Sequence, residues 1–230
     1  METGTQESCR NCVYTAALFE GLSKEELNYL TGFASNRSFR KGETIFTQGD
    51  EIRSVSFLKS GLLKVFKNSL DYKDQIISLA KPNDCVGLLS VFSNTHHQYS
   101  ISALEDSCVY FVDLSAVQHV IQNNGAFGIR LLDKVSKAAD TIINNVCDIH
   151  KKNLRGRIAF ILLEFTDDIY NNHQFEVPVS RREMGELIGM TTENVIRILS
   201  EFRRDGIITI AGKTITIRNK QFLQTLEKYG

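Results

Sequence analysis

The spacing of apolar positions divides the chain into three regions, and the first has the pattern of short strands. Between Arg40 and Val112, runs rich in β-branched and aromatic residues alternate with turn residues such as Gly42, Gly61 and Gly87. Short strands separated by about eight to twelve residues are typical of an all-β barrel or jelly roll. The strands predicted from these runs are Thr44–Phe46, Val55–Leu58, Leu62–Phe66, Ile76–Leu79, Tyr99–Ala103 and Cys108–Val112. A helix is predicted just before them, because Ser23 and Glu26 have the spacing of a capping box.

The second region, Gly125–His150, has a helical period. Its apolar residues recur at alternating spacings of three and four, which is the pattern of a coiled-coil seam. The seam residues are Leu132, Val135, Ala139, Ile142, Val146 and Ile149. This pattern favours a helix that pairs with its copy in a homodimer. The alternative is a helix packed on its own domain, which usually carries a wider apolar stripe.

The third region predicts two helices joined by a short turn. The helices are Ser180–Ile188 and Thr192–Arg204, and the three residues between them include Gly189. This arrangement is typical of a helix-turn-helix. A hairpin of Ile207–Ile210 and Thr214–Ile217 follows and makes it a winged version. Upstream, a helix is expected over Leu154–Phe165.

The second of these helices has two chemically different faces. Val195, Ile198, Leu199 and Phe202 form the apolar face. The residues expected to contact base edges are Thr192, Glu193, Ile196 and Arg197. Glu193 can accept from a cytosine amino group, Arg197 can donate two bonds to guanine, and Ile196 suits a thymine methyl.

The same pattern predicts which residues contact the DNA backbone and which short base sequence each half-site contains. The residues expected to meet phosphates are Ser180, Arg181, Thr191, Ser200 and Lys213. A TTG- or TGA-like core with a fixed G·C pair is expected in each half-site. The alternative is a helical hairpin with a Glu193–Arg197 surface ion pair, which leaves the apolar Ile196 on a polar face unexplained.

Composition limits the classes of protein. Hydrophobic residues make up 42% and charged residues 23%, so disorder is excluded. Lys plus Arg and Asp plus Glu both total 27, which excludes a basic coat over the whole chain. Residues 149–230 carry 13 basic against 10 acidic residues, a net of +3, so a polyanion is expected to bind there.

The location predicted for the protein is the cytoplasm, with no membrane partner. The apolar run Ile158–Leu163 is far shorter than the ~20 residues of a membrane span. No apolar signal-peptide core is found near the N-terminus. Five cysteines, an odd number, favour mostly free thiols.

The stretch Val179–Ile217, VSRREMGELIGMTTENVIRILSEFRRDGIITIAGKTITI, resembles the DNA-binding end of the CRP/FNR transcription regulators. Gly156–Ala159 is similar to the opening of that domain, and Lys41–Glu43 with Gly49-Asp50 is similar to the start of the family's sensor barrel. The resemblance implies an α+β chain with a jelly-roll sensor barrel, a long dimerisation helix and a C-terminal winged helix-turn-helix.

The domains implied by this resemblance are an N-terminal tail at 1–12, a cyclic-nucleotide-binding-like barrel at 13–112, dimerisation helices at 113–151 and a DNA-binding domain at 152–230. The implied partners are double-stranded DNA with a palindromic operator, a second copy of the chain, and RNA polymerase. The DNA-binding domains are expected to reorient about residues near Lys151–Leu154.

The identity of the effector stays open. In the cyclic AMP-binding members, a Gly-Glu pair holds the ribose, an Arg-Ser pair holds the phosphate and a Thr-Ser pair meets the base. The matching residues of the effector pocket here are Gly87 and Leu88, His97 and Gln98, and Ile142 and Ile143. The charge-assisted contacts are missing, so cyclic AMP is not expected to bind.

A second hypothesis is a metal-dependent redox sensor. The oxygen-sensing branch of the family binds an iron–sulfur cluster with three N-terminal cysteines and one in the barrel. Cys9 and Cys12 match the first pair, Leu18 stands at the third position, and the barrel position falls at Tyr110, two residues after Cys108. Cys108 is therefore a candidate substitute ligand, and haem or another cofactor is a further candidate.

Two other classes of protein share part of this pattern. An oxygenase built on a jelly roll needs a triad of His and carboxylate ligands, which this chain lacks, so an enzyme is not expected. A cyclic-nucleotide-binding signalling module acting on partner proteins could share residues 13–112. Such a module would lack the winged region, which is the discriminating feature.

Overall fold

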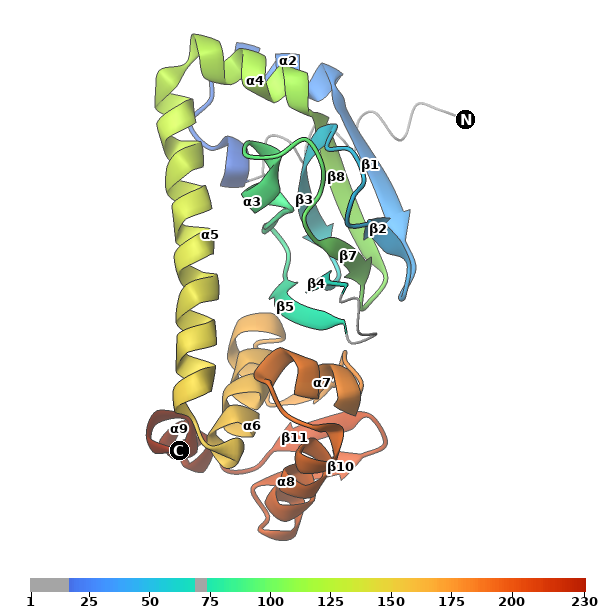
Figure 1. The fold of residues 1–230 in the computed structure, drawn as a ribbon, viewed down its shortest axis with the longest axis vertical. Helices are drawn as coiled ribbons and strands as arrows, with labels where there is room; N and C mark the ends of the chain where they lie inside the picture. Colours follow the sequence, from blue (N-terminus) through green and yellow to red (C-terminus); the bar gives the residue numbers. More distant parts are fainter. Residues whose placement is uncertain (1–16, 69–73) are drawn as a thin grey trace. The chain divides into compact units, whose positions relative to one another are not determined.

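The computed structural model describes residues 17–68 and 74–230, and Figure 1 traces them along the chain. These residues form two units that divide between Thr141 and Ile142, inside a long helix. The first unit contains two antiparallel sheets with several helices, and the second contains helices and a small sheet. The α+β class predicted from the sequence is confirmed. The four domain boundaries expected from the sequence stay predictions.

Two four-stranded sheets make up the predicted barrel. Their strand orders are β1-β8-β3-β6 and β2-β7-β4-β5, so most neighbours are not consecutive in the sequence. All six strands expected from the sequence are present. The strands are β1 (Ala34–Phe39), β2 (Thr44–Phe46), β3 (Ser54–Ser60), β4 (Leu63–Lys67), β5 (Gln75–Ala80), β6 (Cys85–Val86), β7 (Ser100–Ala103) and β8 (Ser107–Asp113).

Strand β1 is not predicted by the apolar pattern. Its residues, ASNRSF, are mostly polar, and none of them is fully buried. It is the edge strand of its sheet, and it pairs with β8 from Ala34 opposite Val112 to Phe39 opposite Ser107. Polar side chains suit an edge strand, because they discourage pairing with another chain. The backbone pairing with β8 therefore holds β1 without an apolar repeat of its own.

Apolar side chains fill the space between the two sheets. Leu58 of β3 and Val109 of β8 pack against Leu63 of β4 and Ile101 of β7. The opposite face of the first sheet carries Phe57 and Tyr110, which are stacked with ring centroids 5.1 Å apart. Alternate residues along β3 and β8 therefore serve two separate cores, as the two-residue period of a strand requires.

Helices cover the outer face of the first sheet and contribute Phe19 and Phe127 to its core. The capping box predicted for the first of the longer helices is confirmed, because Glu26 N donates to Ser23 Oγ at 3.2 Å and Ser23 N donates to Glu26 Oε2 at 2.7 Å. The helices that begin in this unit are the short η1 (Ala17–Phe19), α2 (Lys24–Gly32), α3 (Leu88–Val91), α4 (Leu114–Asn123) and α5 (Gly125–Lys151).

The second unit contains the two helices and the hairpin expected from the sequence. The helix expected over Leu154–Phe165 ends earlier, at Leu163, and continues as a π-helical turn in which Phe165 is buried. Strand β9 pairs with β11, so the small sheet has the order β10-β11-β9. The elements are α6 (Leu154–Leu163), the π-helical η2 (Glu164–Ile169), β9 (Gln174–Glu176), α7 (Arg181–Ile188), α8 (Thr192–Arg204), β10 (Ile208–Ala211), β11 (Thr214–Ile217) and α9 (Lys220–Tyr229).

Helix α6 is the central element of the second unit, and polar contacts fix its first turn. Asn153 caps it by accepting from the backbone N–H groups of Arg155 and Gly156. Lys152 Nζ donates to Glu227 Oε1 of α9 at 2.6 Å. Arg157 Nε donates to the Lys152 carbonyl at 3.0 Å, and its Nη1 donates to the carbonyl of Gly189, which ends α7, at 2.9 Å. Segment 152–157 is therefore fastened within the second unit.

Helix α7 approaches the turn before α8 closely at Gly185. A Cβ atom at Gly185 would lie 2.5 Å from the carbonyl oxygen of Met190. Changing Gly185→Ala should therefore force the turn to move and lower the free energy of unfolding by about 1–3 kcal/mol. Thermal melting followed by circular dichroism measures this. Gly32→Ala is the control, since its Cβ meets nothing within 4 Å; equal melting temperatures for the two variants would contradict the prediction.

Candidate nucleic-acid interface

Local sequence signals set the geometry of α7 and α8. Ser180 caps α7 and forms the predicted capping box with Glu183. Gly189 ends α7 with φ 62°, a left-handed conformation that glycine adopts without steric cost. Thr191 caps α8, and its side chain accepts from Asn194 N at 3.3 Å. The two helices of the helix-turn-helix are thus fixed by their own caps.

Helix α8 has the two faces that its sequence predicts. Val195, Ile198, Leu199 and Phe202 are buried, and the first and last of these are fully enclosed. Glu193, Ile196, Arg197 and Ser200 are exposed, and Thr192 is half-buried. Ile196 is 50% exposed although it is a large apolar residue. Its branched aliphatic side chain therefore lies half in water on a polar surface instead of packing inside the protein.

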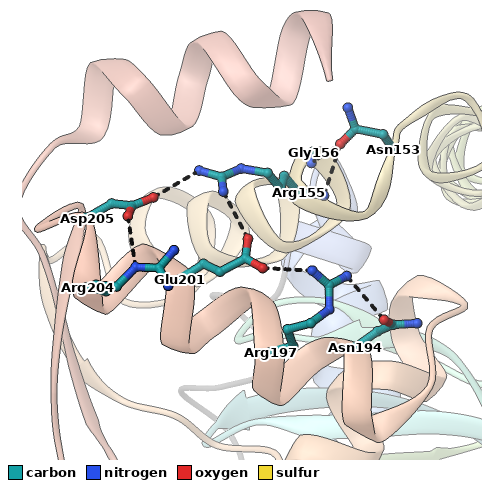
Figure 2. A network of polar contacts seen from close by, with 8 residues as sticks. All are labelled: Asn153, Arg155, Gly156, Asn194, Arg197, Glu201, Arg204 and Asp205. Carbon is teal, nitrogen blue, oxygen red and sulfur yellow. Dashed lines mark hydrogen bonds and ion pairs between the residues drawn. The ribbon is translucent and has the colours of Figure 1, made fainter.

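The charged side chains on this face, Glu193 and Arg197, are partly oriented by hydrogen bonds. Hydrogen bonds from its own backbone N–H and from the Thr191 side chain lower the pKa of Glu193, so its carboxylate is an acceptor at neutral pH. Arg197 does not pair with Glu193. Its Nη1 donates to Glu201 Oε1 at 2.7 Å, and its Nη2 donates to Asn194 Oδ1 at 3.3 Å (Figure 2).

A second arginine, from another helix, holds the carboxylate that meets Arg197. Arg155 Nη1 of α6 donates to Glu201 Oε2 at 3.0 Å, and its Nη2 donates to Asp205 Oδ2 at 3.4 Å. Figure 2 shows the resulting chain of contacts from the first turn of α6 to Arg197. The sequence pattern does not predict a role for Asn194, Glu201 or Arg155. The spacing of Glu201, four residues after Arg197, is the signal that could have found it.

The residues predicted to meet phosphates lie on both helices and on the wing. Ser180 and Thr191 accept cap bonds with their side-chain oxygens, and the Thr191 hydroxyl also donates to the Glu193 carboxylate. Ser200 Oγ donates to the Ile196 carbonyl at 2.8 Å. Arg181 is half-buried, and desolvation lowers its pKa. Lys213 follows Gly212 in the turn of the hairpin, where it is exposed and 4.0 Å from Glu176 Oε1.

The apolar surface of α5 is only partly the one expected. Leu132 is 61% and Val146 46% exposed, as a seam requires of a single chain. Val135, Ala139, Ile142 and Ile149 are half-buried, and Val135 packs on the barrel core. Ile143 is 58% and Ile129 69% exposed. The exposed apolar stripe therefore consists of Ile129, Leu132, Ile143 and Val146.

Two of the candidate effector residues are in contact within the first unit. Gly87 and His97 lie together, because a Cβ on Gly87 would be 3.5 Å from the His97 ring. His97 is buried and stacks on Phe46 with ring centroids 4.2 Å apart; burial lowers its pKa, so the ring is neutral at pH 7. Leu88 is buried instead in the core around Phe57 and Tyr110.

The other three candidate effector residues are placed differently from His97. Gln98 is exposed, and its Nε2 donates to the His96 carbonyl at 3.1 Å. Ile142 and Ile143 belong to α5 within the second unit. Within the first unit the structure brings Gly87 and His97 together, and the place of Ile142 and Ile143 in the pocket stays a prediction.

The cysteines offer no metal site within residues 17–68 and 74–230, where no group of three or more His, Cys, Asp or Glu side chains could hold an ion. Burial raises the pKa of Cys85 to about 12, so its thiol is protonated at neutral pH. Cys108 is half-buried and packs against the core that contains Phe57 and Tyr110. Cys9 and Cys12 lie outside the described residues, so the hypothesis that they bind a cluster stays a prediction.

Two family models match the chain, in the order expected from its sequence. Residues 36–124 match the cyclic nucleotide-binding domain, and residues 156–226 match the Crp-like helix-turn-helix domain. The second match includes the capped helices α7 and α8 and the wing. In the described part of the chain, no helix has the length and apolar character required to span a membrane.

Curated relatives and solved structures agree with these matches. The fumarate and nitrate reduction regulatory proteins of Salmonella typhimurium and Escherichia coli K12 are each 28% identical over 213 residues, which is 89% of this chain and 84% of the relative. The structure of FixK2 from Bradyrhizobium japonicum is 26% identical, with a TM-score of 0.76 over 84% of this chain and 97% of that one. A putative crp/fnr-family regulator from Eubacterium rectale, 18% identical, shares the fold, with a TM-score of 0.75 over 92% of this chain and 98% of that one.

These relatives are transcription regulators and not enzymes, and the capped helix-turn-helix with its wing is the part of the chain that binds DNA. The chain belongs to the CRP/FNR family of DNA-binding transcription regulators.

Proposed function

We propose that the protein binds a palindromic operator in the cytoplasm as a homodimer, and that each α8 contacts the base edges of one half-site. The observation that carries this proposal is the free face of α8, where the half-exposed Ile196 stands between the ionised Glu193 and Arg197. One buried face and one free face are what a helix needs to enter a major groove. RNA polymerase is the further partner that we infer from the family.

Each exposed side chain on α8 suits a different group in the groove. Arg197 donates to guanine O6 and N7, and Glu193 accepts from the amino group of a cytosine. Ile196 has no hydrogen-bonding group, so a thymine methyl is its natural contact. Lys213 on the wing is 75% exposed, and it supplies a phosphate contact that carries no sequence information.

The exposed stripe of α5 supports the dimer. Ile129, Leu132, Ile143 and Val146 follow a helical repeat and leave apolar surface in water. Burial of such a stripe against a second copy of the helix is favourable by about 25 cal/mol for each Å² removed from water. A pair of linked DNA-binding units then matches two half-sites about one helical turn apart.

We propose that the barrel responds to a signal other than cyclic AMP. A cyclic phosphate needs a charge-assisted donor, whereas His97 is neutral and stacked on Phe46. The acid that would hold a ribose is replaced by Leu88, which is packed in an apolar core. A metal or iron–sulfur sensor that uses Cys9 and Cys12 is the second candidate, and a metal analysis of protein purified without oxygen tests it.

The contacts to bases are tested with palindromic duplexes that have TTG or TGA cores and single substitutions. Arg197→Ala should lower the preference at the G·C pair by about 1–3 kcal/mol, because a bidentate contact is lost.

Ile196→Ser should lower the preference at one neighbouring T by about 1 kcal/mol. Lys213→Ala should weaken all duplexes alike and reduce the salt slope by about one. Binding at two salt concentrations measures all three; an Ile196 variant with wild-type preference at every position would show that Ile196 contacts no base.

The dimer is tested at Ile143. Because Ile143 is already exposed in the single chain, Ile143→Asp should leave the fold intact but place a charge on the exposed stripe that the second copy covers, at a cost of several kcal/mol. Sedimentation should then show monomers, and affinity for the palindrome should fall. Asn144→Asp adds the same charge about 100° around the helix and is the control. A wild-type monomer that binds a palindrome tightly would contradict the dimer.

The proposal for the effector predicts that cyclic AMP does not stabilise the protein. A ligand present at 100 times its Kd adds about 2.7 kcal/mol of stability, which is readily seen as a rise in melting temperature. With millimolar cyclic AMP, we expect the melting temperature and the operator affinity to stay unchanged. A clear rise in either one would show that the argument from Leu88 and His97 is wrong.

A further inference from the structure

Arg197 is held from both sides along α8. Glu201 accepts from its Nη1 at 2.7 Å, and Asn194 accepts from its Nη2 at 3.3 Å. A guanidinium has more N–H groups than these two contacts use, so others can still donate to a base. The Arg197 side chain is 53% exposed, whereas that of Glu201 is only 22% exposed. The acceptor is thus more enclosed than the donor that it orients.

The position of Glu201 is fixed from α6. Arg155 donates to the second carboxylate oxygen of Glu201 at 3.0 Å, and its guanidinium lies over the Phe202 ring at 5.0 Å from the centroid. Asp205 accepts from the other end of the same guanidinium. Figure 2 shows Glu201 between the two arginines, with one oxygen turned toward each.

Arg155 also compensates the charge of Glu201. A carboxylate beside the DNA-contacting face repels phosphates, and the guanidinium of Arg155 offsets that repulsion without reaching the groove. The Arg155–Glu201 pair is partly buried, with the two side chains 32% and 22% exposed. It restricts the rotamers of a long side chain before binding, which reduces the entropy lost in the complex.

We propose that Glu201 is a positioning residue that orients Arg197 for base discrimination, and that Arg155 holds Glu201 in place. This inference rests on the proposed function, in which Arg197 contacts a guanine. It adds two residues that do not touch DNA to those that determine its sequence preference. It also connects base recognition to the first turn of α6.

The test uses the full-length protein and a duplex library with randomised half-sites, and it measures the enrichment of each base at each position. Glu201→Gln keeps the shape of the side chain and removes its charge. We expect it to lower discrimination at the G·C pair that depends on Arg197 by about fivefold, while neighbouring positions stay as in the wild type. In the Arg197→Ala background the same change should have no further effect.

The matched control is Glu186→Gln. Glu186 accepts from Arg182 at 2.9 Å in another pair four residues apart, on α7. The Glu186→Gln change removes the same charge from the same unit without touching Arg197, so base discrimination should stay unchanged. Arg155→Met is the second variant, and it should lower discrimination at the same base pair. Melting temperatures report whether each variant is folded.

The outcomes separate the two proposals. A wild-type protein that enriches no sequence contradicts the proposed function itself. If Arg197→Ala loses the G·C preference but Glu201→Gln and Arg155→Met keep it, only the positioning role is wrong. An equal change in affinity for all duplexes with Glu201→Gln would also overturn the positioning role, because that result indicates a general electrostatic effect.

Discussion

The anchoring of the first turn of α6 is the constraint on which the DNA-binding unit depends. Lys152 is bound by Glu227 of α9, Arg155 by Glu201 of α8, and Arg157 by the carbonyl at the end of α7. Behind this turn, Ile158 and Leu162 are fully buried. Helices α7, α8 and α9 therefore all contact the first turn of α6. The polar contacts of α6 fix how these helices are oriented, and its apolar contacts supply most of the free energy of their packing.

This anchoring limits how a signal can move the DNA-binding unit. A pivot placed after Lys152, among the residues near Lys151–Leu154 where the family resemblance places it, would break the Lys152–Glu227 contact, in which the Lys152 side chain is only 11% exposed. Loss of one partner of an enclosed ion pair is costly. The two units divide upstream, within α5, and motion there would strain the backbone hydrogen bonds of a continuous helix.

Features encoded by neighbouring residues could be predicted from the sequence, and those that depend on distant contacts could not. The Ser23 and Ser180 capping boxes and the two faces of α8 follow from local spacing. Strand β1 escapes prediction because pairing with β8, far along the chain, holds its polar residues. The pair of Arg197 with Glu201 could have been found from their spacing of four residues. The contact that fixes Glu201 could not, because it comes from Arg155 of α6, far along the chain. Ile143, assigned from the resemblance to a pocket, lies on the exposed stripe of α5 because helix rotation depends on packing.

The separation of the two faces of α8 has an evolutionary consequence. Val195, Ile198, Leu199 and Phe202 are buried, and their substitution would cost folding stability. Glu193, Ile196 and Arg197 are exposed, so most replacements there leave stability almost unchanged. Selection on operator preference can therefore act on one set of codons while selection on folding acts on the other. Duplicated copies of such a gene could diverge to new operators in single steps, without first acquiring stabilising substitutions elsewhere.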